Sequence, residues 1–357
     1  MQSLEYLYEI KNKNTIYFDR KVSISSKNTI INGVKKSGKT HLVRDFLTHF
    51  EQINILYIDL NDERIEKKRV VQNLEKFIQS KPIEILVIEN FDFSFALPKV
   101  SHIILTCNSN YQPIKGFETI TLFPLDFEEF ISFDKKHFNI EHLFNLYTTF
   151  GTFPSLILEN NSESIFKIQE MLRSMFDDKV EFLIFKKFTE SQGNKISLFQ
   201  VYNQLKTSIK ISKDNLYNKV KKLEDEKMLF FVEKFLSPKA NKKVFLIDFA
   251  IKSALTFKKD FLRNFENIVF LELLKRDEKI YYTDLIDLYN DEKNYAIFCI
   301  PFLTEDFIEI KLNKILSHLK ELHIKKVDIV TIGNEGGFLL ENIECTILPF
   351  WDWALQY

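Results

Sequence analysis

Residues 33–40 read Gly33-Val34-Lys35-Lys36-Ser37-Gly38-Lys39-Thr40, the complete pattern G-x-x-x-x-G-K-T of a phosphate-binding loop. The chain has only eight glycines, and two of them stand at the required spacing. Glycines let the backbone wrap a phosphate closely, and the following helix points its first amides at the anion. Residues 33–41, with His41 as the last member, therefore predict a nucleotide site. The alternative is an ordinary strand-to-helix turn that carries a solvated lysine.

The flanking sequence fits a nucleotide site. Residues 28–32 predict a short buried strand, and residues 41–50 place apolar side chains at helical spacing. In such a loop Lys39 is expected to reach the β- and γ-phosphates of ATP, while the Thr40 hydroxyl is expected to ligate Mg²⁺. ATP and Mg²⁺ are therefore the predicted cofactors.

Residues 1–125 alternate apolar strands with amphipathic helices. Strands are predicted over residues 28–32, 54–60, 82–88, 102–106 and 118–122, and a helix over residues 67–80. Nearly continuous apolar runs are typical of parallel strands that are covered on both faces. The pattern predicts a doubly wound α/β core, with nucleotide bound at the carboxyl ends of the strands.

Composition limits the broad class of the protein. The 357 residues are 45% hydrophobic and 28% charged, with a formal net charge of −1, which suits a globular protein of two or three domains. The three cysteines have no C-x-x-C spacing, so a reducing cytoplasm is expected. Neither a signal peptide at the N-terminus nor a membrane span is expected from the sequence.

The remainder of the chain predicts three further domains. Residues 126–178 are expected to form a helical lid. Residues 179–257 are expected to form three helices and a β-hairpin, which is the order of a winged helix, with Ser212 capping the third helix. Residues 258–357 return to an α/β pattern, with a helix at 265–276 and another near 314–322. We find no internal repeat and no low-complexity linker.

A local basic patch accompanies the predicted winged helix. Residues 179–245 contain fifteen Lys and seven Asp or Glu, a formal charge of +8. A winged helix places its third helix in the major groove and its wing beside the DNA backbone. Double-stranded DNA is thus a candidate partner, and the alternative is a winged helix that serves only as a packing module. The candidate nucleic-acid contacts are Lys213, Lys219, Lys222, Lys239, Lys242 and Lys243.

Several stretches resemble one family, the prokaryotic AAA-type ATPases that join a P-loop core to a winged helix and a restriction-nuclease-like C-terminal domain. Besides the loop, the resemblance rests on residues 57–64, 123–130, 150–154, 265–273 and 308–311, in the same order along the chain. It implies a P-loop NTPase core over residues 1–125 and a C-terminal domain resembling PD-(D/E)xK nucleases.

The chain departs from that family at the end of the strand 85–88. The family carries Asp-Glu there, whereas this chain has Glu89-Asn90. Glu89 can still hold the magnesium shell, but Asn90 cannot accept a proton, so the general base is missing from its usual place. Asp92 is a possible substitute or only a solvated loop acid. The resemblance places a γ-phosphate sensor at Asn108 or Ser109, and the alternative there is a turn-forming Asn.

The resemblance also implies a nuclease site that this chain keeps only in part. Glu266, Glu309 and Lys311 match by position, with residues 308–311 read as a strand. The expected hairpin acid is replaced by Tyr295, and losing one carboxylate weakens a Mg²⁺ site. We therefore expect a non-catalytic relative, in which Glu309 and Lys311 form an ordinary strand pair.

Three functions fit the sequence. The first is an ATP-binding AAA-type protein with slow or lost hydrolysis, whose nucleotide state controls the winged-helix and C-terminal domains, with or without DNA. The second is an ATP-gated, metal-dependent DNA nuclease. The third is a non-enzymatic scaffold that holds ATP as a structural ligand. A protein partner or a homo-oligomer is compatible with each, and no arginine finger can be assigned.

Overall fold

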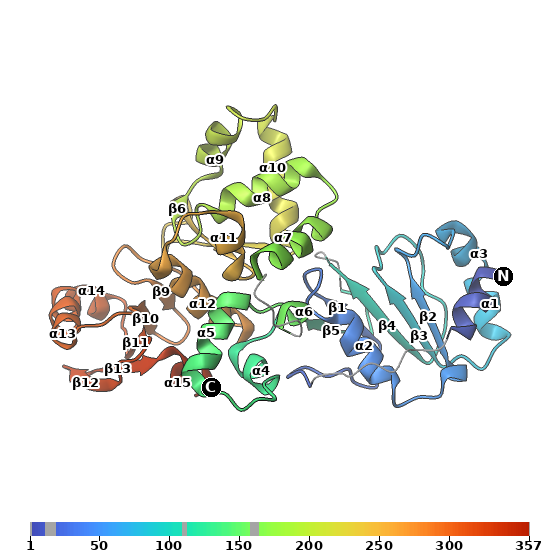
Figure 1. Ribbon diagram of the computed structural model, residues 1–357, viewed down its shortest axis with the longest axis horizontal. Coiled ribbons are helices and arrows are strands. Elements are labelled where there is room, and N and C mark those ends of the chain that lie inside the picture. Colours follow the sequence, from blue (N-terminus) through green and yellow to red (C-terminus); the bar gives the residue numbers. More distant parts are fainter. Residues whose placement is uncertain (1, 11–18, 109–112, 158–163, 357) are drawn as a thin grey trace. The chain divides into compact units, whose positions relative to one another are not determined.

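The computed structural model describes residues 2–10, 19–108, 113–157 and 164–356. The chain divides into two compact units, Met1–Pro124 and Leu125–Tyr357, here called unit 1 and unit 2. Figure 1 shows their helices and strands coloured along the sequence. Each unit is described by itself.

Unit 1 is built on a five-stranded parallel sheet with the strand order β2-β3-β4-β1-β5. The central strands are apolar and fully buried, as expected for a parallel sheet covered on both faces. The predicted parallel α/β core is thereby confirmed. Its strands are β1 (Thr29–Asn32), β2 (Ile55–Asp59), β3 (Ile85–Glu89), β4 (His102–Cys107) and β5 (Glu118–Thr121).

Helices cover the two faces of this sheet. Alternate residues of β1, β2, β3 and β4 belong to two separate apolar clusters, because successive side chains of a strand point to opposite faces. One cluster includes side chains of α1 (Gln2–Glu9) and α3 (Lys67–Gln79). The other includes side chains of α2 (Lys39–Leu47). The C-terminal ends of β1, β3 and β4 meet at the edge of the sheet where α2 begins.

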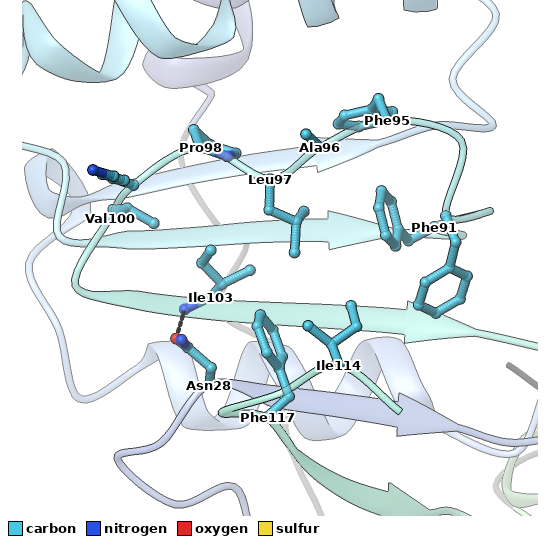
Figure 2. A pocket seen from close by; sticks show the side chains of 12 residues that line it. Asn28, Phe91, Phe95, Ala96, Leu97, Pro98, Val100, Ile103, Ile114 and Phe117 are labelled. Carbon is cyan, nitrogen blue, oxygen red and sulfur yellow. Dashed lines mark hydrogen bonds between the residues drawn. The ribbon is translucent and has the colours of Figure 1, made fainter. Parts of the chain in front are cut away.

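The connection from β3 to β4, residues 90–101, contains no helix. Its side chains line an apolar pocket of about 600 Å³ over the sheet (Figure 2). Within the pocket the side-chain Oδ1 of Asn28 accepts a hydrogen bond from the Ile103 backbone N–H over 2.7 Å. The lining offers no cluster of phosphate-binding donors, so this pocket is not the candidate nucleotide site. Its lining includes Phe91, Phe95, Leu97, Ile103, Ile114 and Phe117.

Unit 2 begins with helices that are tied to later parts of the same unit. The buried carboxylate of Glu272 accepts hydrogen bonds from the Tyr147 hydroxyl at 2.9 Å and the Phe127 amide at 3.1 Å. The buried carboxylate of Asp248 likewise receives the amide and hydroxyl of Thr152. The predicted lid and the later segments therefore pack as parts of one unit. These first helices are α4 (Phe127–Ser132), α5 (Ile140–Phe150), α6 (Pro154–Ile157) and α7 (Ser164–Met175).

Residues 179–257 form the predicted order of helices followed by a hairpin. Ser212 caps α10 by accepting from the Asn215 amide over 3.2 Å, and Leu216, Val220 and Leu223 of this helix are buried. Strands β7 and β8 pair antiparallel, and β6 joins the other edge of β8. The elements are α8 (Lys179–Thr189), β6 (Lys195–Ile196), α9 (Leu198–Leu205), α10 (Lys213–Asp225), β7 (Leu229–Val232), β8 (Lys242–Leu246) and α11 (Ala250–Leu255).

The C-terminal part of unit 2 contains a second, mixed sheet with the order β12-β13-β11-β10-β9. One prediction is wrong here: residues 308–311 lie in helix α13 and not in a strand. Their buried side chains recur at helical spacing and pack on the sheet through Ile308 and Leu312. The elements are α12 (Phe261–Lys275), β9 (Leu288–Asn290), β10 (Tyr295–Cys299), α13 (Glu305–Lys314), α14 (Leu316–Glu321), β11 (Lys326–Thr331), β12 (Gly336–Leu340), β13 (Ile343–Pro349) and α15 (Phe350–Leu355).

Candidate nucleotide site

The loop between β1 and α2 is shaped by its backbone. Lys36 and Gly38 have φ angles of 69° and 101°, in the left-handed region that favours glycine. A Cβ built on Gly33 would lie 2.2 Å from the carbonyl oxygen of Leu122, so only glycine fits at position 33. No side chain caps α2 at Gly38, and its first-turn amides are therefore available to an anion.

The Lys39 ammonium lies inside this loop. It donates to the carbonyl oxygens of Gly33 at 2.7 Å and Val34 at 2.9 Å, and to Asn108 Oδ1 at 2.7 Å. Burial lowers the pKa of Lys39 from 10.5 to about 8, and the charges of Cys107 and Glu89 oppose this shift only in part. A phosphate group placed against the ammonium would supply a full counter-charge.

Thr40 and Glu89 form the second half of the site. The Thr40 hydroxyl donates to Glu89 Oε2 over 3.0 Å. Glu89 is 5% exposed, and its Oε1 has no hydrogen-bond partner in the described parts of the chain. Burial raises the pKa of the Glu89 carboxyl, although interactions with the Tyr57 hydroxyl and then with the Thr40 hydroxyl oppose the shift. A buried carboxylate with a spare oxygen beside a hydroxyl is a donor set that suits Mg²⁺.

Asn90 links two neighbouring strand ends. Its Nδ2 donates to Asp59 Oδ1 over 2.8 Å, and its Oδ1 accepts from Asn108 Nδ2 over 3.4 Å. Because Asn108 also accepts from Lys39, side-chain hydrogen bonds run from the Asp59 carboxylate to the Lys39 ammonium. The φ angle of Asn90 is 57°, a left-handed conformation that asparagine adopts more readily than glutamate. The backbone thus gives a physical reason for the departure at this position.

Asp92 belongs to different surroundings from Asn90. It pairs with Lys67 at the start of α3 and accepts from the Ser94 amide over 3.3 Å. Partial burial alone would raise the pKa of Asp92, but the Lys67 and Ser94 hydrogen bonds outweigh it and lower the pKa. Its side chain is 54% exposed. These contacts fit the solvated loop acid better than a base. Ser109, the alternative sensor, lies outside the described residues.

The other loop residues lie nearer to solvent. Lys36 and His41 are exposed, and Lys35 is half-buried. Partial desolvation, and then the charge of Arg44, lower the pKa of the His41 imidazole. Ser37 is fully buried. Of the side chains of this loop, Lys39 contacts the loop carbonyl groups and Thr40 contacts Glu89.

Sequence reasoning missed two residues near the loop. Asp59, at the end of β2, holds the Asn90 amide as described above. The Arg20 guanidinium donates to the carbonyl oxygens of Ser37 at 3.0 Å and Phe123 at 2.8 Å, which fastens the loop to the chain that follows β5. The sequence places Asp59 near the end of the predicted strand 54–60, but its pairing with Glu89 depends on the register of β2 beside β3.

Four of the six lysines proposed to contact DNA are paired within unit 2. Lys243 is buried and pairs with Glu266, so its candidacy as a DNA contact is wrong. Lys219 pairs with Asp178, and Lys222 lies 2.9 Å from a Glu181 oxygen, so both face α8. Lys242 pairs with Glu233 at 2.7 Å. These ion pairs reduce the positive charge that the patch can offer to a phosphate.

Lys213, Lys221 and Lys239 are exposed and have no acidic partner within the described ranges. Lys213 is exposed and packs over the rings of Phe199 and Tyr217, and Lys221 is exposed further along α10. Lys239 is also exposed, in the turn between β7 and β8. The surface with unpaired basic charge is therefore smaller than the sequence predicted.

The structure brings the predicted nuclease residues together only in part: Glu266 and Lys311 both interact electrostatically with Cys299, whereas Glu309 is exposed. Glu266 is buried, and its charge is balanced by Lys243 and by Arg263 at 3.0 Å; burial raises its pKa. Glu309 is exposed on α13, and Lys311 lies 5.0 Å from the centre of the Phe298 ring. Residues two apart on a helix do not share a face, so the predicted strand pair does not form.

The acid before the β9–β10 hairpin is Asp287, which sequence reasoning missed. Its Oδ2 accepts from the Cys299 amide over 3.1 Å, and its backbone carbonyl accepts from Lys243 over 3.0 Å. Tyr295, proposed to stand in place of an acid, instead donates its hydroxyl to Asp328. Across the described ranges, no three His, Cys, Asp or Glu side chains are grouped so as to hold a metal.

Unit 1 combines a parallel central sheet with a G-x-x-x-x-G-K-T loop between β1 and α2. A scan against protein-family models gives no match. The uncharacterized protein MJ1544 of Methanocaldococcus jannaschii is 26% identical over an alignment of 400 residues, which covers 94% of this chain and 89% of that protein.

Solved structures similar to this chain include a Walker-type ATPase of Pyrococcus abyssi, at 16% identity over 64% of this chain and 90% of that chain, with a TM-score of 0.42. The Orc1 protein of Aeropyrum pernix, solved in complex with DNA, is 13% identical over 70% of this chain and 88% of that chain, with a TM-score of 0.36. AMPPCP-bound DnaA of Aquifex aeolicus is 13% identical over 63% of this chain and 86% of that chain, with a TM-score of 0.28. With these TM-scores the overall similarity is limited, and the site is interpreted from its own geometry.

None of the helices in the described ranges combines the length and the apolar character that a bilayer span requires.

Proposed function

We propose that this protein binds ATP with Mg²⁺ through residues 33–41 of unit 1. The observation that carries the proposal is the Lys39 ammonium, which is buried inside the loop among neutral acceptors and has its pKa lowered to about 8. A buried cation without a full counter-charge favours an anionic ligand. The uncapped N-terminus of α2 adds amide donors for the same anion.

Each side chain has a separate part in this proposal. Lys39 contacts the terminal phosphates and exchanges its hydrogen bonds to the loop carbonyls for them. Thr40 and Glu89 hold Mg²⁺, and the unpaired buried oxygen of Glu89 fits that part. When bound, Mg²⁺ would neutralise phosphate charge. Asn108, which already contacts Lys39, lies where a polar side chain can sense the γ-phosphate.

Hydrolysis is proposed to be slow. Asn90 cannot take a proton, and the contacts of Asp92 direct it to Lys67. A missing general base typically costs about 10²–10⁴-fold in rate. ATP would then act mainly as a ligand whose binding and release alter the protein, with weak turnover. If turnover is absent altogether, ATP would serve only as a structural ligand.

For unit 2 we propose a helical lid over residues 126–178, a winged helix over residues 179–257 and a third α/β domain over residues 258–357. Three helices followed by an antiparallel hairpin, α8-α9-α10-β7-β8, support the winged helix. Nuclease activity is not included, because Glu266 is already neutralised by Lys243 and Arg263, and Glu309 and Lys311 lie apart from a shared face.

Binding of double-stranded DNA is a second candidate function for unit 2. The net charge of +8 over residues 179–245 and the exposed, unpaired Lys213 and Lys221 of α10 favour it. Changing both to alanine is expected to weaken binding to all duplex sequences alike and to reduce the salt-dependence slope by about two. Lys219→Ala with Lys222→Ala is the matched control on the same helix, because both lysines are already paired. If the control pair weakens binding as much as the test pair, the proposed surface is wrong.

Calorimetry with Mg-ATP tests the main proposal. Wild-type protein is expected to bind, and Lys39→Ala is expected to lose a charge-assisted contact. Binding should also raise the melting temperature through linkage. An absence of binding at millimolar nucleotide would refute the proposal for residues 33–41.

A further inference from the structure

A carboxylate from the neighbouring strand stands beside the position that lacks a general base. Asp59 ends β2, in register with Glu89 at the end of β3. Asp59 Oδ1 accepts from Asn90 Nδ2 over 2.8 Å and from the Asn61 amide over 2.9 Å. Asp59 and Asn90 are both half-buried, so water can reach this pair. Carboxylate and amide are therefore paired across two strands, with the carboxylate on β2 and the amide on β3.

We propose that Asp59 accepts the proton of the water that attacks ATP, and so supports the slow turnover that remains without an acid at position 90. The inference rests on the proposed binding of ATP at residues 33–41. In the step, the water oxygen forms a bond to the γ-phosphorus while the bond from that phosphorus to the β,γ-bridging oxygen breaks. The bonding electrons leave with ADP, and the proton of the water passes to the Asp59 carboxylate, which later returns it to solvent. Asn90 keeps its hydrogen bond from Nδ2 to Asp59, while its Oδ1 faces Asn108.

The other acids near this edge of the sheet have different partners. Asp92 pairs with Lys67, and Asp62 accepts three side-chain hydrogen bonds from Arg64. Glu89 accepts from Thr40, which assigns it to the cation. Asp59 has backbone and amide partners and no hydrogen bond from a lysine or arginine side chain in the described ranges. Among the acids compared here, Asp59 is therefore the carboxylate that is not engaged by a cationic side chain or assigned to Mg²⁺.

The substitution Asp59→Asn distinguishes a role of Asp59 in proton transfer from a purely structural role. An asparagine at position 59 can keep both hydrogen bonds that Oδ1 accepts, yet it cannot take up a proton at working pH. Turnover at saturating Mg-ATP is expected to fall about 10²-fold or more, while the calorimetric affinity for Mg-ATP stays within a factor of about three. Asp62→Asn, on the same turn, is the matched control and is expected to leave turnover unchanged.

One further readout would not respond to a merely structural role. The exchanged pair Asp59→Asn with Asn90→Asp is expected to recover activity, because it restores one carboxylate and one amide. Aspartate tolerates the φ of 57° at position 90, so this exchange adds little strain.

The outcomes separate this inference from the proposed nucleotide site. If Mg-ATP does not bind to the wild type, the proposed function fails. If it binds without measurable turnover, or if Asp59→Asn turns over like the wild type, the role of Asp59 is refuted while ATP binding stands. A fall in turnover matched by an equal loss of Mg-ATP affinity would also refute it, since Asp59 would then act only in binding.

Discussion

The protonation of Lys39 should make ATP binding dependent on pH. Its pKa in the free protein is lowered to about 8, chiefly by burial. A phosphate placed against the ammonium would raise that pKa again, because an opposite charge favours the charged form. Binding of ATP must therefore be coupled to proton uptake by Lys39, and alkaline pH should weaken it.

The size of the effect follows from the pKa. With a pKa of about 8, Lys39 is about 90% protonated at pH 7 and about 10% protonated at pH 9. If the charged form binds ATP, the apparent affinity should fall about tenfold between these two values. At pH 8 the binding reaction should take up about half a proton. Phosphate groups, whose second pKa is about 6, change little over this range.

Calorimetry in buffers of different ionisation enthalpy measures the proton uptake directly. Lys39→Arg is the control, because arginine stays charged at pH 9, and any remaining binding by this variant should lose the pH dependence. An affinity that is constant from pH 7 to pH 9 with no proton uptake would contradict the interpretation that the buried ammonium is the phosphate ligand.

Two other substitutions test the site. Gly33→Ala should lower stability by roughly 1–3 kcal/mol and weaken ATP binding, because its Cβ would lie 2.2 Å from the Leu122 carbonyl oxygen. Thermal denaturation measures the loss of stability. Gly333→Ala is the control and should leave the melting temperature unchanged, because nothing lies within 4 Å of a Cβ at that position. Glu89→Gln should raise the melting temperature at pH 7, since burial raises the pKa of Glu89 and the charged form therefore costs stability. That gain should shrink as the pH falls and wild-type Glu89 becomes protonated, while the dependence of ATP binding on Mg²⁺ should weaken; if Mg²⁺ acts equally on both proteins, Glu89 does not hold it.

The core of unit 1 could be predicted from the sequence because its signals are local. The glycine spacing of residues 33–38 and the apolar runs of the strands determine a parallel sheet with the loop at its edge. Parallel strands end at the same edge, so Thr40 and Glu89 were expected to meet there, and they do. Asn108 also reaches Lys39 from the adjacent strand end.

The partnership of Asp59 with Asn90 could not be predicted in the same way. It depends on which strand lies beside β3 and in what register, which no short stretch of sequence specifies. The left-handed backbone at Asn90 was equally hidden, although asparagine is among the residues that adopt it most often. The amide at this position reflects local backbone geometry as well as chemistry.

The errors in unit 2 have two physical sources. The buried residues Ile308, Leu312 and Leu319 recur at helical spacing, and this periodicity was overlooked in favour of a three-residue Glu-x-Lys pattern. For the basic patch, net charge was counted without its partners. Lys219 and Lys222 are three residues apart on α10, as are the acids Asp178 and Glu181 that receive them, and only tertiary packing brings the two pairs together.

The binding of Mg-ATP to the wild type and to Lys39→Ala, measured by calorimetry at pH 7, tests the central claim most directly. We expect the wild type to bind with one site per chain and Lys39→Ala to bind at least tenfold more weakly, with an unchanged far-ultraviolet circular dichroism spectrum. Equal affinities for the two proteins, or no binding to the wild type at millimolar nucleotide, would contradict the claim that residues 33–41 form a nucleotide site.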